Sequence, residues 1–401
     1  MKRASALIFC CLFACLLASA SVVQAGGFAL YEWSQRGIAM ATTGYAQAGD
    51  ASVIATNPAL MTKLEGKHVL VGATLIAPQT SVYLDGSENK TKAKVFTVPH
   101  AYYTQQMESN ENVWLGVGLF TRFGLGTYYD DTWAGKSSLQ YVDVKSVSLN
   151  PNIAFKFSDD LSVAAGIEIL KGSFDLQKDL SGIGRSIISF HTSGYGVGGN
   201  IGMSYDINDE WSAGLTWRAP MKLYTTGSAD YSWANISSED GQEISATLPG
   251  SYTLAFAYEP TDDWVFEFDL IHTRWEATKA ISYDGSISST TQLNYKNTWR
   301  GQLGAEYWTT DWLAVRLGYA YDQTPTRAGD ASFMLPANDR HLFSTGLGYK
   351  MNNWKIDWSF MYVVTKERKG LGISDGAGSN WTVDFKGGKT WITGMSVGYE
   401  F

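Results

Sequence analysis

The sequence predicts an all-β protein, a closed transmembrane β-barrel of 14 antiparallel strands whose lumen is plugged by a small N-terminal hatch of short helices. Three observations support this fold class. A tight polar turn recurs about every 45–50 residues, several strands alternate between apolar and polar residues for nine or more positions, and the chain ends in an alternating aromatic strand. Alternation over such lengths is typical of strands that face lipid on one side and water on the other.

The composition fits a barrel better than a soluble core. The 401 residues include 41 glycines and 55 aromatic residues but only nine prolines, and the mean hydropathy is slightly negative. Beyond residue 25, no hydrophobic run reaches the roughly 18 residues that a membrane-spanning helix needs. A chain that is rich in aromatic residues yet polar on average is expected of barrel strands.

Residues 1–25 are predicted to be a secretory signal peptide. Lys2 and Arg3 form a short basic region, an apolar stretch follows, and Val23 and Ala25 supply small residues before a cleavage site. All cysteines lie in this segment, so the mature chain is expected to contain no disulfide and no thiolate metal site. These cysteines are Cys10, Cys11 and Cys15.

The charge argues against a nucleic-acid partner. The formal net charge is −8, and loss of Lys2 and Arg3 with the signal peptide would make it more negative still. No basic run occurs in the rest of the chain. Nucleic-acid-binding proteins usually carry a basic patch or stripe, so we expect none of that class as partner.

Six polar clusters predict tight hairpin turns, because Asn and Asp tolerate the backbone angles of such turns. Each turn joins two strands, and one further strand at each end of the barrel brings the total to 14, an even number as bacterial barrels require. Seven long polar segments alternate with the turns and are expected to be extracellular loops. The turns lie at Asn112–Trp114, Asp160–Leu161, Glu210–Trp211, Asp263–Trp264, Asp311–Trp312 and Asn353–Trp354, and the loops at 84–92, 126–139, 176–190, 228–242, 283–290, 325–338 and 367–386.

The strands after these turns alternate with period two. From Trp264 to Leu270, apolar residues occupy every second position, whereas Glu267 and Asp269 lie on the other face. The same pattern begins at Leu161 and continues through Ile169. A soluble β-sandwich would alternate similarly, but its strands usually span only ~5–6 residues.

The last strand alternates as well and ends in Phe401. Such a terminal strand resembles the assembly signal of bacterial outer-membrane barrels. We therefore expect the protein to reside in the outer membrane of a Gram-negative-type bacterium.

Residues 26–66 break the strand pattern with small residues and tight bends, and the first strand-like run begins near His68. A barrel of 14 strands has room for such a segment in its lumen. We therefore expect a hatch over 26–66 and the barrel over 67–401.

The sequence resembles the FadL family of outer-membrane channels over essentially the whole mature chain. Three blocks carry the resemblance, one in the hatch, one in the third strand and its loop, and one before the strand that ends at Gly348–Tyr349. The matching residues are Gly27–Phe28, Glu32, Gly37, Gly44, Asp50–Ala51 and Asn57–Leu60; Phe123–Leu125 and Asp131–Gly135; and Pro325 with Leu335–Arg340.

The resemblance implies a channel for hydrophobic molecules, either long-chain fatty acids or aromatic hydrocarbons. Family members capture the ligand in an apolar lumen pocket, shift the hatch, and release the ligand sideways beside a kinked third strand. The partners implied are a hydrophobic small molecule and the lipids of the outer membrane. We expect a monomer and no cofactor, and the residues leave the choice of cargo open.

The third strand is expected from Val113 to about Thr127, and Arg122, Phe123 and Gly124 fall where the family has its kink. Glycine within a strand permits a bend or bulge. The alternative is that the glycines of this strand only relieve crowding between side chains in a curved barrel wall. They are Gly116, Gly118, Gly124 and Gly126.

Five further residues are candidates for ligand binding or gating. Asn57, Pro58 and Ala59 would anchor the hatch and line the ligand path, although Asn-Pro also starts simple turns. Phe28 is assigned to the path by the same resemblance. Lys171, near the end of the fifth strand, would meet a carboxylate head group or would be a solvated lumen residue.

Two other functions are alternatives to a channel for hydrophobic molecules. A general diffusion porin for small polar solutes would need an open lumen, which a hatch over 26–66 argues against. A barrel enzyme would need a converging catalytic set, but the histidines are scattered and lack metal-ligand spacing. They are His68, His100, His191, His272 and His341. We therefore expect no catalytic residues and no metal site.

Overall fold

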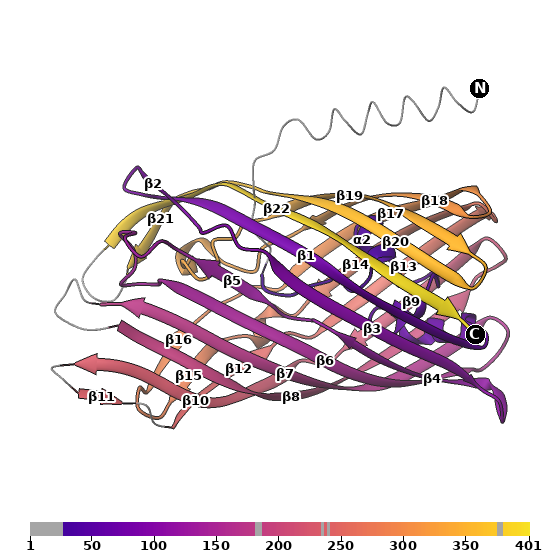
Figure 1. Ribbon diagram of the computed structural model, residues 1–401, viewed down its shortest axis with the longest axis horizontal. Helices are drawn as coiled ribbons and strands as arrows, with labels where there is room; N and C mark the ends of the chain where they lie inside the picture. The colour runs from indigo at the N-terminus through magenta and orange to yellow at the C-terminus, as the bar shows by residue number, and fades with distance from the viewer. Residues whose placement is uncertain (1–26, 181–186, 234–235, 239–240, 375–379) are drawn as a thin grey trace, which may run out of the picture.

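The computed structural model describes residues 27–180, 187–233, 236–238, 241–374 and 380–401. The predicted signal peptide lies outside the described residues. The described part forms one closed sheet in which every pairing is antiparallel (Figure 1). β1 (Lys67–Leu84) pairs with β3 (Phe96–Met107) on one side and with β22 (Asn380–Glu400) on the other, which closes the barrel.

The prediction of 14 barrel strands is confirmed over the described residues. Six of these strands are interrupted and therefore consist of two labelled segments each, and β2 (Ser87–Lys90) and β11 (Ile236–Ser238) only extend hairpins. In chain order the strands are β1; β3; β4 (Asn110–Phe120) with β5 (Leu125–Tyr128); β6 (Tyr141–Lys156); β7 (Leu161–Asp179); β8 (Ile187–Asp206); β9 (Trp211–Arg218) with β10 (Met221–Trp233); β12 (Gln242–Leu248) with β13 (Ser251–Thr261); β14 (Trp264–Thr273) with β15 (Ala280–Asp284); β16 (Ser289–Gln292) with β17 (Thr298–Thr310); β18 (Leu313–Asp322); β19 (Arg340–Met351); β20 (Trp354–Thr365) with β21 (Arg368–Ser374); and β22.

The six predicted turns lie close to where the strands reverse. β7, β9, β14 and β20 begin at the residues expected, whereas β4 begins at Asn110, two residues before the expected turn at Asn112. Several expected loops contain strand; within 228–242, for example, β10 continues to Trp233 and is followed by β11 and the start of β12. β7 continues to Asp179 and β8 begins at Ile187, so the expected loop over 176–190 is largely strand; β21 and β22 likewise occupy most of 367–386. Cross-strand pairing satisfies the backbone in water as well as in lipid, so the wall continues beyond the apolar belt.

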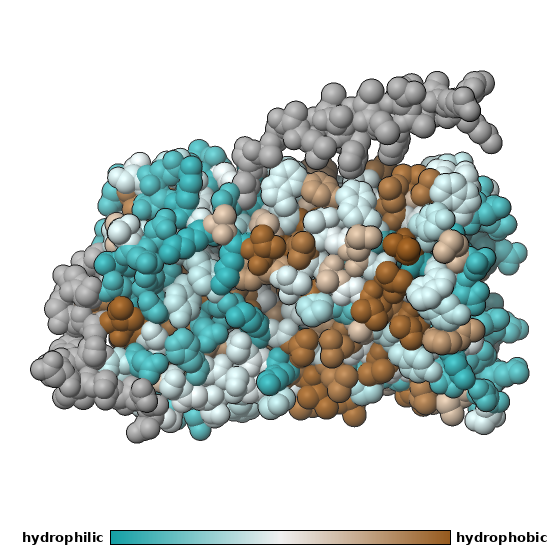
Figure 2. All heavy atoms as spheres, viewed as in Figure 1, coloured by the Kyte–Doolittle hydropathy of each residue, from teal (hydrophilic) through white to brown (hydrophobic). Residues whose placement is uncertain are grey.

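The two faces of the wall differ as the alternation predicts. Trp264, Phe266 and Phe268 are exposed on the outside, whereas Glu267 and Asp269 are buried in the lumen. On the face seen in Figure 2, hydrophobic residues form a band over the half of the barrel nearer the C-terminus, whereas hydrophilic residues cover the end that carries the long loops and also fringe the end that carries the short turns. Bacterial barrels place short turns in the periplasm and long loops outside the cell.

Inside the barrel, residues 27–66 form α2 (Gln35–Ala39) and two 3₁₀ turns, η1 (Ala51–Ile54) and η2 (Pro58–Lys63) (Figure 1). Side chains cap both 3₁₀ turns: Asp50 accepts a hydrogen bond from the Ser52 N–H at 2.8 Å, and Asn57 accepts one from the Ala59 N–H at 3.2 Å. Among the described residues, no helix is long and apolar enough to cross a membrane. We call residues 27–66 the hatch.

Candidate functional site

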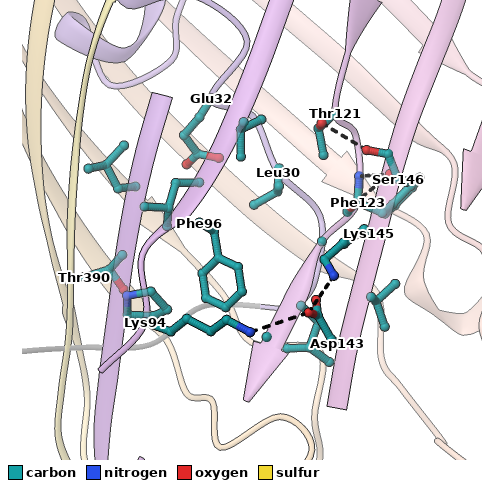
Figure 3. Close-up of a pocket in the computed structure, with 18 of the residues that line it drawn as sticks. Leu30, Glu32, Lys94, Phe96, Thr121, Phe123, Asp143, Lys145, Ser146 and Thr390 are labelled. Atoms are coloured by element: carbon teal, nitrogen blue, oxygen red, sulfur yellow. Dashed lines mark hydrogen bonds and ion pairs between the residues drawn. The ribbon is translucent and has the colours of Figure 1, made fainter. Parts of the chain in front are cut away.

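A cavity of about 410 Å³ lies in the loop-side half of the lumen, against the third strand of the barrel (Figure 3). Its walls are mostly apolar and come from five parts of the chain: the hatch, the β1–β3 wall, the third and fourth strands, the segment that leads into β19, and strands β20 and β22. Leu30, Ile76, Phe96, Val98, Phe123, Leu125, Val144, Leu335 and Ile392 supply much of the apolar lining.

The third strand is interrupted beside this cavity. β4 ends at Phe120 and β5 begins at Leu125, and the pairing with β6 is broken between them. The interruption includes Arg122, Phe123 and Gly124, where the sequence predicted a kink. Ser146 of β6 spans part of the gap, because its Oγ donates a hydrogen bond to the Phe123 carbonyl at 2.7 Å and the Phe123 N–H donates back to that oxygen at 3.3 Å.

The hatch occupies the inner side of this gap. Leu30 N–H donates to the Arg122 carbonyl and Gly124 N–H donates to the Phe28 carbonyl, both at 2.9 Å. Ala29 and Phe123 therefore face each other as an isolated antiparallel bridge. Backbone groups that the strand leaves unpaired in the wall are satisfied by the hatch instead.

Charged groups converge at the loop-side rim of the cavity. The ammonium of Lys145 lies 2.9 Å from a carboxylate oxygen of Asp143, and that of Lys94 lies 3.9 Å from the same oxygen (Figure 3). Lys94 also lies 3.6 Å from the centre of the Tyr128 ring, a cation–π distance. Lys94 and Lys145 supply two cations that can hold an anionic head group whose apolar tail enters the cavity, although Asp143 and Asp175, which lies opposite it on β7, offset part of this charge.

Sequence reasoning did not single out Lys94 or Lys145. Lys94 lies just outside the expected loop at 84–92, and Lys145 follows another expected loop. Alternation alone could assign Lys145 to a face of its strand. The proximity of Lys145 to Lys94 depends on the gap, because β5 pairs with β6 but not with the start of β3.

A smaller apolar chamber of about 70 Å³ adjoins the cavity and shares Leu125, Val144 and Leu335 with it. Phe28 lines this chamber and contacts two aromatic residues, with ring centres 4.8 Å from Trp275 and 5.9 Å from Phe123. Phe28 and Phe123 thus form an aromatic contact between the two apolar spaces.

Arg122 does not line the large cavity but ties the gap to the wall. Its guanidinium donates to Glu168 of β7 at 3.1 Å and to the Pro249 carbonyl at 3.1 Å. Glu168 also accepts from Arg218 of β9 at 3.3 Å, and Arg218 donates to the Ile54 carbonyl of the hatch at 3.0 Å. Because these charges are buried, removal of one partner would leave the others uncompensated and destabilise the fold. The network connects the gap to the hatch.

Asn57, Pro58 and Ala59 lie at the periplasmic side of the hatch, and none of them lines the cavity. The Asn57 amide donates to the Tyr45 carbonyl at 2.8 Å and to the Met203 carbonyl of β8 at 2.9 Å. Glycines on the wall allow this approach, since a Cβ on Gly202 would lie 2.3 Å from the Asn57 side chain. In this structure Asn57 joins the hatch to the wall, away from the cavity.

The expectation for Lys171 is corrected. Lys171 is exposed on the outer face of β7, between buried Leu170 and Gly172, and it does not line the cavity. The alternation that places Ile167 and Ile169 outside also places Lys171 outside, so the pattern in the sequence already contained this result. Lys171 is neither a pocket residue nor a lumen residue.

A further anchor of the hatch is Glu267 of β14. One of its carboxylate oxygens accepts hydrogen bonds from three successive hatch N–H groups, those of Gly44, Tyr45 and Ala46, at 3.0, 2.5 and 2.8 Å. The sequence placed Glu267 on the inward face, but the pairing with residues 44–46 is set by the packing of the hatch. Within the described ranges, no group of three or more His, Cys, Asp or Glu residues is arranged to hold a metal ion.

Comparison with known proteins places these features in context. The family model described as "Outer membrane protein transport protein (OMPP1/FadL/TodX)" matches residues 16–401. Outer membrane protein P1 of Haemophilus influenzae is 26% identical over 455 aligned positions, covering 96% of this chain and 98% of that protein. The long-chain fatty acid transport protein of Salmonella typhi is 24% identical and covers 94% of both chains.

A solved structure shares the fold. A FadL homologue from Pseudomonas aeruginosa superimposes with a TM-score of 0.85 at 18% identity, covering 94% of this chain and 100% of that one. This likeness confirms the barrel architecture.

Proposed function

Because the chain belongs to the outer membrane protein transport family (OMPP1/FadL/TodX), we propose that it carries hydrophobic molecules into the cell through its lumen cavity and releases them sideways through the gap in the third strand. Its place is the outer membrane, and its relatives are transport proteins rather than enzymes. The route through the cavity and the gap is our proposal.

One observation carries it: the apolar cavity lies against the interruption between Phe120 and Leu125, and Phe123 and Gly124 line the cavity from within that interruption. A hydrophobic molecule gains little from a water-filled pore, because transfer into water is unfavourable. A concave apolar chamber with a few polar groups is a typical ligand site. A gap beside it offers a way into the lipid phase.

Release requires the hatch to move. The gap is covered on its inner side by the bridge between Ala29 and Phe123. Leu30 of the hatch and Phe123 of the third strand both line the cavity, so a ligand held there would contact both partners of this cover. Displacement of the first hatch residues would uncover the gap, while Asn57 and Glu267 keep the rest of the hatch attached to the wall.

The rim favours a long-chain carboxylate as cargo over a neutral aromatic hydrocarbon. Lys94 and Lys145 supply cations where the apolar cavity meets the loops, and charge-assisted hydrogen bonds to a carboxylate are stronger than neutral ones. A relative, the long-chain fatty acid transport protein of Salmonella typhi, bears the name of such a cargo.

The test is to obstruct the gap. Gly124 has ordinary backbone angles, and a Cβ there would lie 3.1 Å from the flexible Leu30 side chain. Gly124→Trp therefore places an indole at the inner side of the gap, against Leu30 of the hatch, and Gly124→Ala is its matched control. Uptake of labelled oleate and labelled toluene is compared in cells that lack other importers, with barrel folding checked by heat-modifiable gel mobility.

We expect oleate uptake by the unaltered protein and by Gly124→Ala, and uptake near background for Gly124→Trp. Unchanged uptake by folded Gly124→Trp would refute the lateral route. Failure of the unaltered protein to raise uptake of either compound above background would refute transport of these cargoes altogether.

A further inference from the structure

A basic patch lies on the outside of the barrel, at the loop-side edge of the apolar belt. On β7 the outward residues from Leu161 to Ile169 are apolar, and Lys171 is the first polar one. On β6 the exposed Lys145 follows the apolar outward residues in the same way, and β10 carries the exposed Lys222. These nine-residue apolar stretches match the span of a membrane strand, so the lysines lie at its outer boundary.

Strand register makes the patch continuous. Val147 lies opposite Lys171 on β6 and β7, Lys171 lies opposite Tyr195 on β8, and Tyr195 lies opposite Tyr224 on β10. Directly paired residues have neighbouring side chains. Lys145 and Lys222 are each two positions from a member of this row and share its face. We call Lys145, Lys171, Tyr195, Lys222 and Tyr224 the basic patch.

Two of the three lysines of the patch have no acidic partner among the described residues, whereas Lys145 pairs with Asp143 at 2.9 Å. Neither Lys171 nor Lys222 forms an ion pair with any described residue, and the Lys222 ammonium lies 4.4 Å from the Tyr224 ring centre. Lys145 shares Asp143 with Lys94. Beyond Asp143, other outward acids lie farther towards the loops: Asp175 contacts His191 at 2.9 Å, and Glu243 lies opposite Thr226.

The opposite edge of the belt differs. There the outward residues are aromatic, and they pack in pairs, Trp211 with Tyr258 and Trp264 with Tyr307, with ring centres 4.5 and 4.3 Å apart. Aromatic rings suit either membrane interface. Among the described residues, Lys171 and Lys222 are outward cations without acidic partners at the loop-side edge, and they indicate a leaflet whose head groups are negatively charged, because basic residues near an anionic surface are attracted to it.

We propose that the basic patch binds the phosphate groups of lipids in the outer leaflet of the outer membrane. The lysine stems lie along apolar surface and extend their ammonium groups to the level of the head groups, and the exposed tyrosines Tyr195 and Tyr224 add apolar area and hydroxyl donors. The site lies beside the gap, because Lys145 belongs to β6, which borders it. Its occupant is a bisphosphorylated lipid, held chiefly by Lys171 and Lys222, which do not line the cargo cavity.

The experiment uses the full-length protein in a neutral detergent and lipid A as the probe. Lys171→Gln with Lys222→Gln removes two cations of the patch, and Lys156→Gln with Lys350→Gln is the matched control at the periplasmic end. Native mass spectrometry measures bound lipid A, monophosphoryl lipid A and phosphatidylcholine. Lys171→Arg with Lys222→Arg tests whether charge alone suffices.

We expect lipid A to bind the unaltered protein, the control and the arginine variant equally, and the glutamine variant about tenfold more weakly. Monophosphoryl lipid A should bind more weakly than lipid A, and phosphatidylcholine should not distinguish the variants. Equal binding of lipid A by the glutamine variant and the control, or an equal loss in both, would overturn the proposal. Oleate uptake by the glutamine variant is expected to persist, so failure here is separable from failure of the transport route.

Discussion

Ala29 of the hatch and Phe123 of the third strand face each other in an isolated antiparallel bridge, flanked by two backbone hydrogen bonds of 2.9 Å. These bonds join the neighbours of the two residues, so Ala29 and Phe123 form a non-hydrogen-bonded pair, the kind with the closer Cα atoms. The bridge connects the N-terminal segment to the one place where the third strand leaves the wall. In the proposed route, this contact would therefore have to separate before the gap could open.

A disulfide at this bridge should lock the gap. Cα atoms of a non-hydrogen-bonded pair lie ~4.5 Å apart, within the range that a disulfide spans. Ala29→Cys with Phe123→Cys is expected to reduce oleate uptake to near background when oxidised, and to recover on treatment with a reductant. All natural cysteines lie within residues 1–15, so no other thiol competes once that segment is removed.

Each single cysteine variant serves as control and should respond to neither oxidant nor reductant. Full uptake by the oxidised double variant, with the disulfide verified by mass spectrometry, would show that the hatch and the gap need not separate during transport.

Glu168 should be required for stability. It lies between two buried arginines, Arg122 and Arg218, at 3.1 and 3.3 Å. Glu168→Gln leaves these two positive charges without their shared carboxylate, and removing one partner of a buried ion pair costs roughly 3–5 kcal/mol. We expect a lower unfolding temperature, measured by heat-modifiable gel mobility. Glu210→Gln, at an exposed turn, should leave that temperature unchanged, and a similar result for both variants would contradict this role.

Asn57 should hold the hatch in the lumen. Its amide donates to the Tyr45 and Met203 carbonyls, and its oxygen caps η2. Asn57→Ala removes all three hydrogen bonds, worth roughly 2 kcal/mol together. We expect more frequent openings in single-channel recordings and faster proteolysis of residues 27–66.

The comparison variant is Asn57→Asp, which keeps the helix cap but replaces both donors by a carboxylate. If tethering matters more than capping, Asn57→Asp should behave like Asn57→Ala. Wild-type behaviour of Asn57→Asp would show that the contact with Met203 contributes little.

The rim lysines should discriminate between cargoes. Lys94→Gln with Lys145→Gln removes the cations but preserves the apolar cavity. We expect the Kd for oleate to rise about tenfold, and the Kd for toluene to stay the same, as measured by fluorescence displacement. Lys171→Gln is the matched control, because its ammonium lies on the outer face. An equal loss for both ligands would indicate a structural effect, and no loss for oleate would point to a neutral cargo.

The barrel itself could be predicted because its signals are local. The pleat assigns successive residues to opposite faces, so the alternation from Trp264 already placed Glu267 in the lumen. Turn residues marked the periplasmic reversals, and the absence of alternation before His68 marked the hatch. Even the outward direction of Lys171 followed from the residues before it, although the lone lysine had been assigned to the lumen.

The site could be predicted only in part. A kink at Arg122–Gly124 was expected from glycine content and from the family resemblance; the structure shows the pairing with β6 interrupted there, and the kink itself stays a prediction. Lys94, Lys145 and Glu168 were not expected, because nothing in their own segments distinguishes them from other charged residues. Each acquires its environment from residues far away in the chain.

The sequence by itself thus determined the fold class, the strand count, the faces of the strands and the family. Only the tertiary structure decided which residues meet: Ala29 with Phe123 at the gap, Glu267 with the hatch N–H groups, and Lys94 with Lys145 at the rim. The physical reason is that alternation and turns depend on neighbours in sequence. Contacts across the lumen depend instead on the stagger and tilt with which the closed barrel aligns distant strands, and on how the hatch packs inside it.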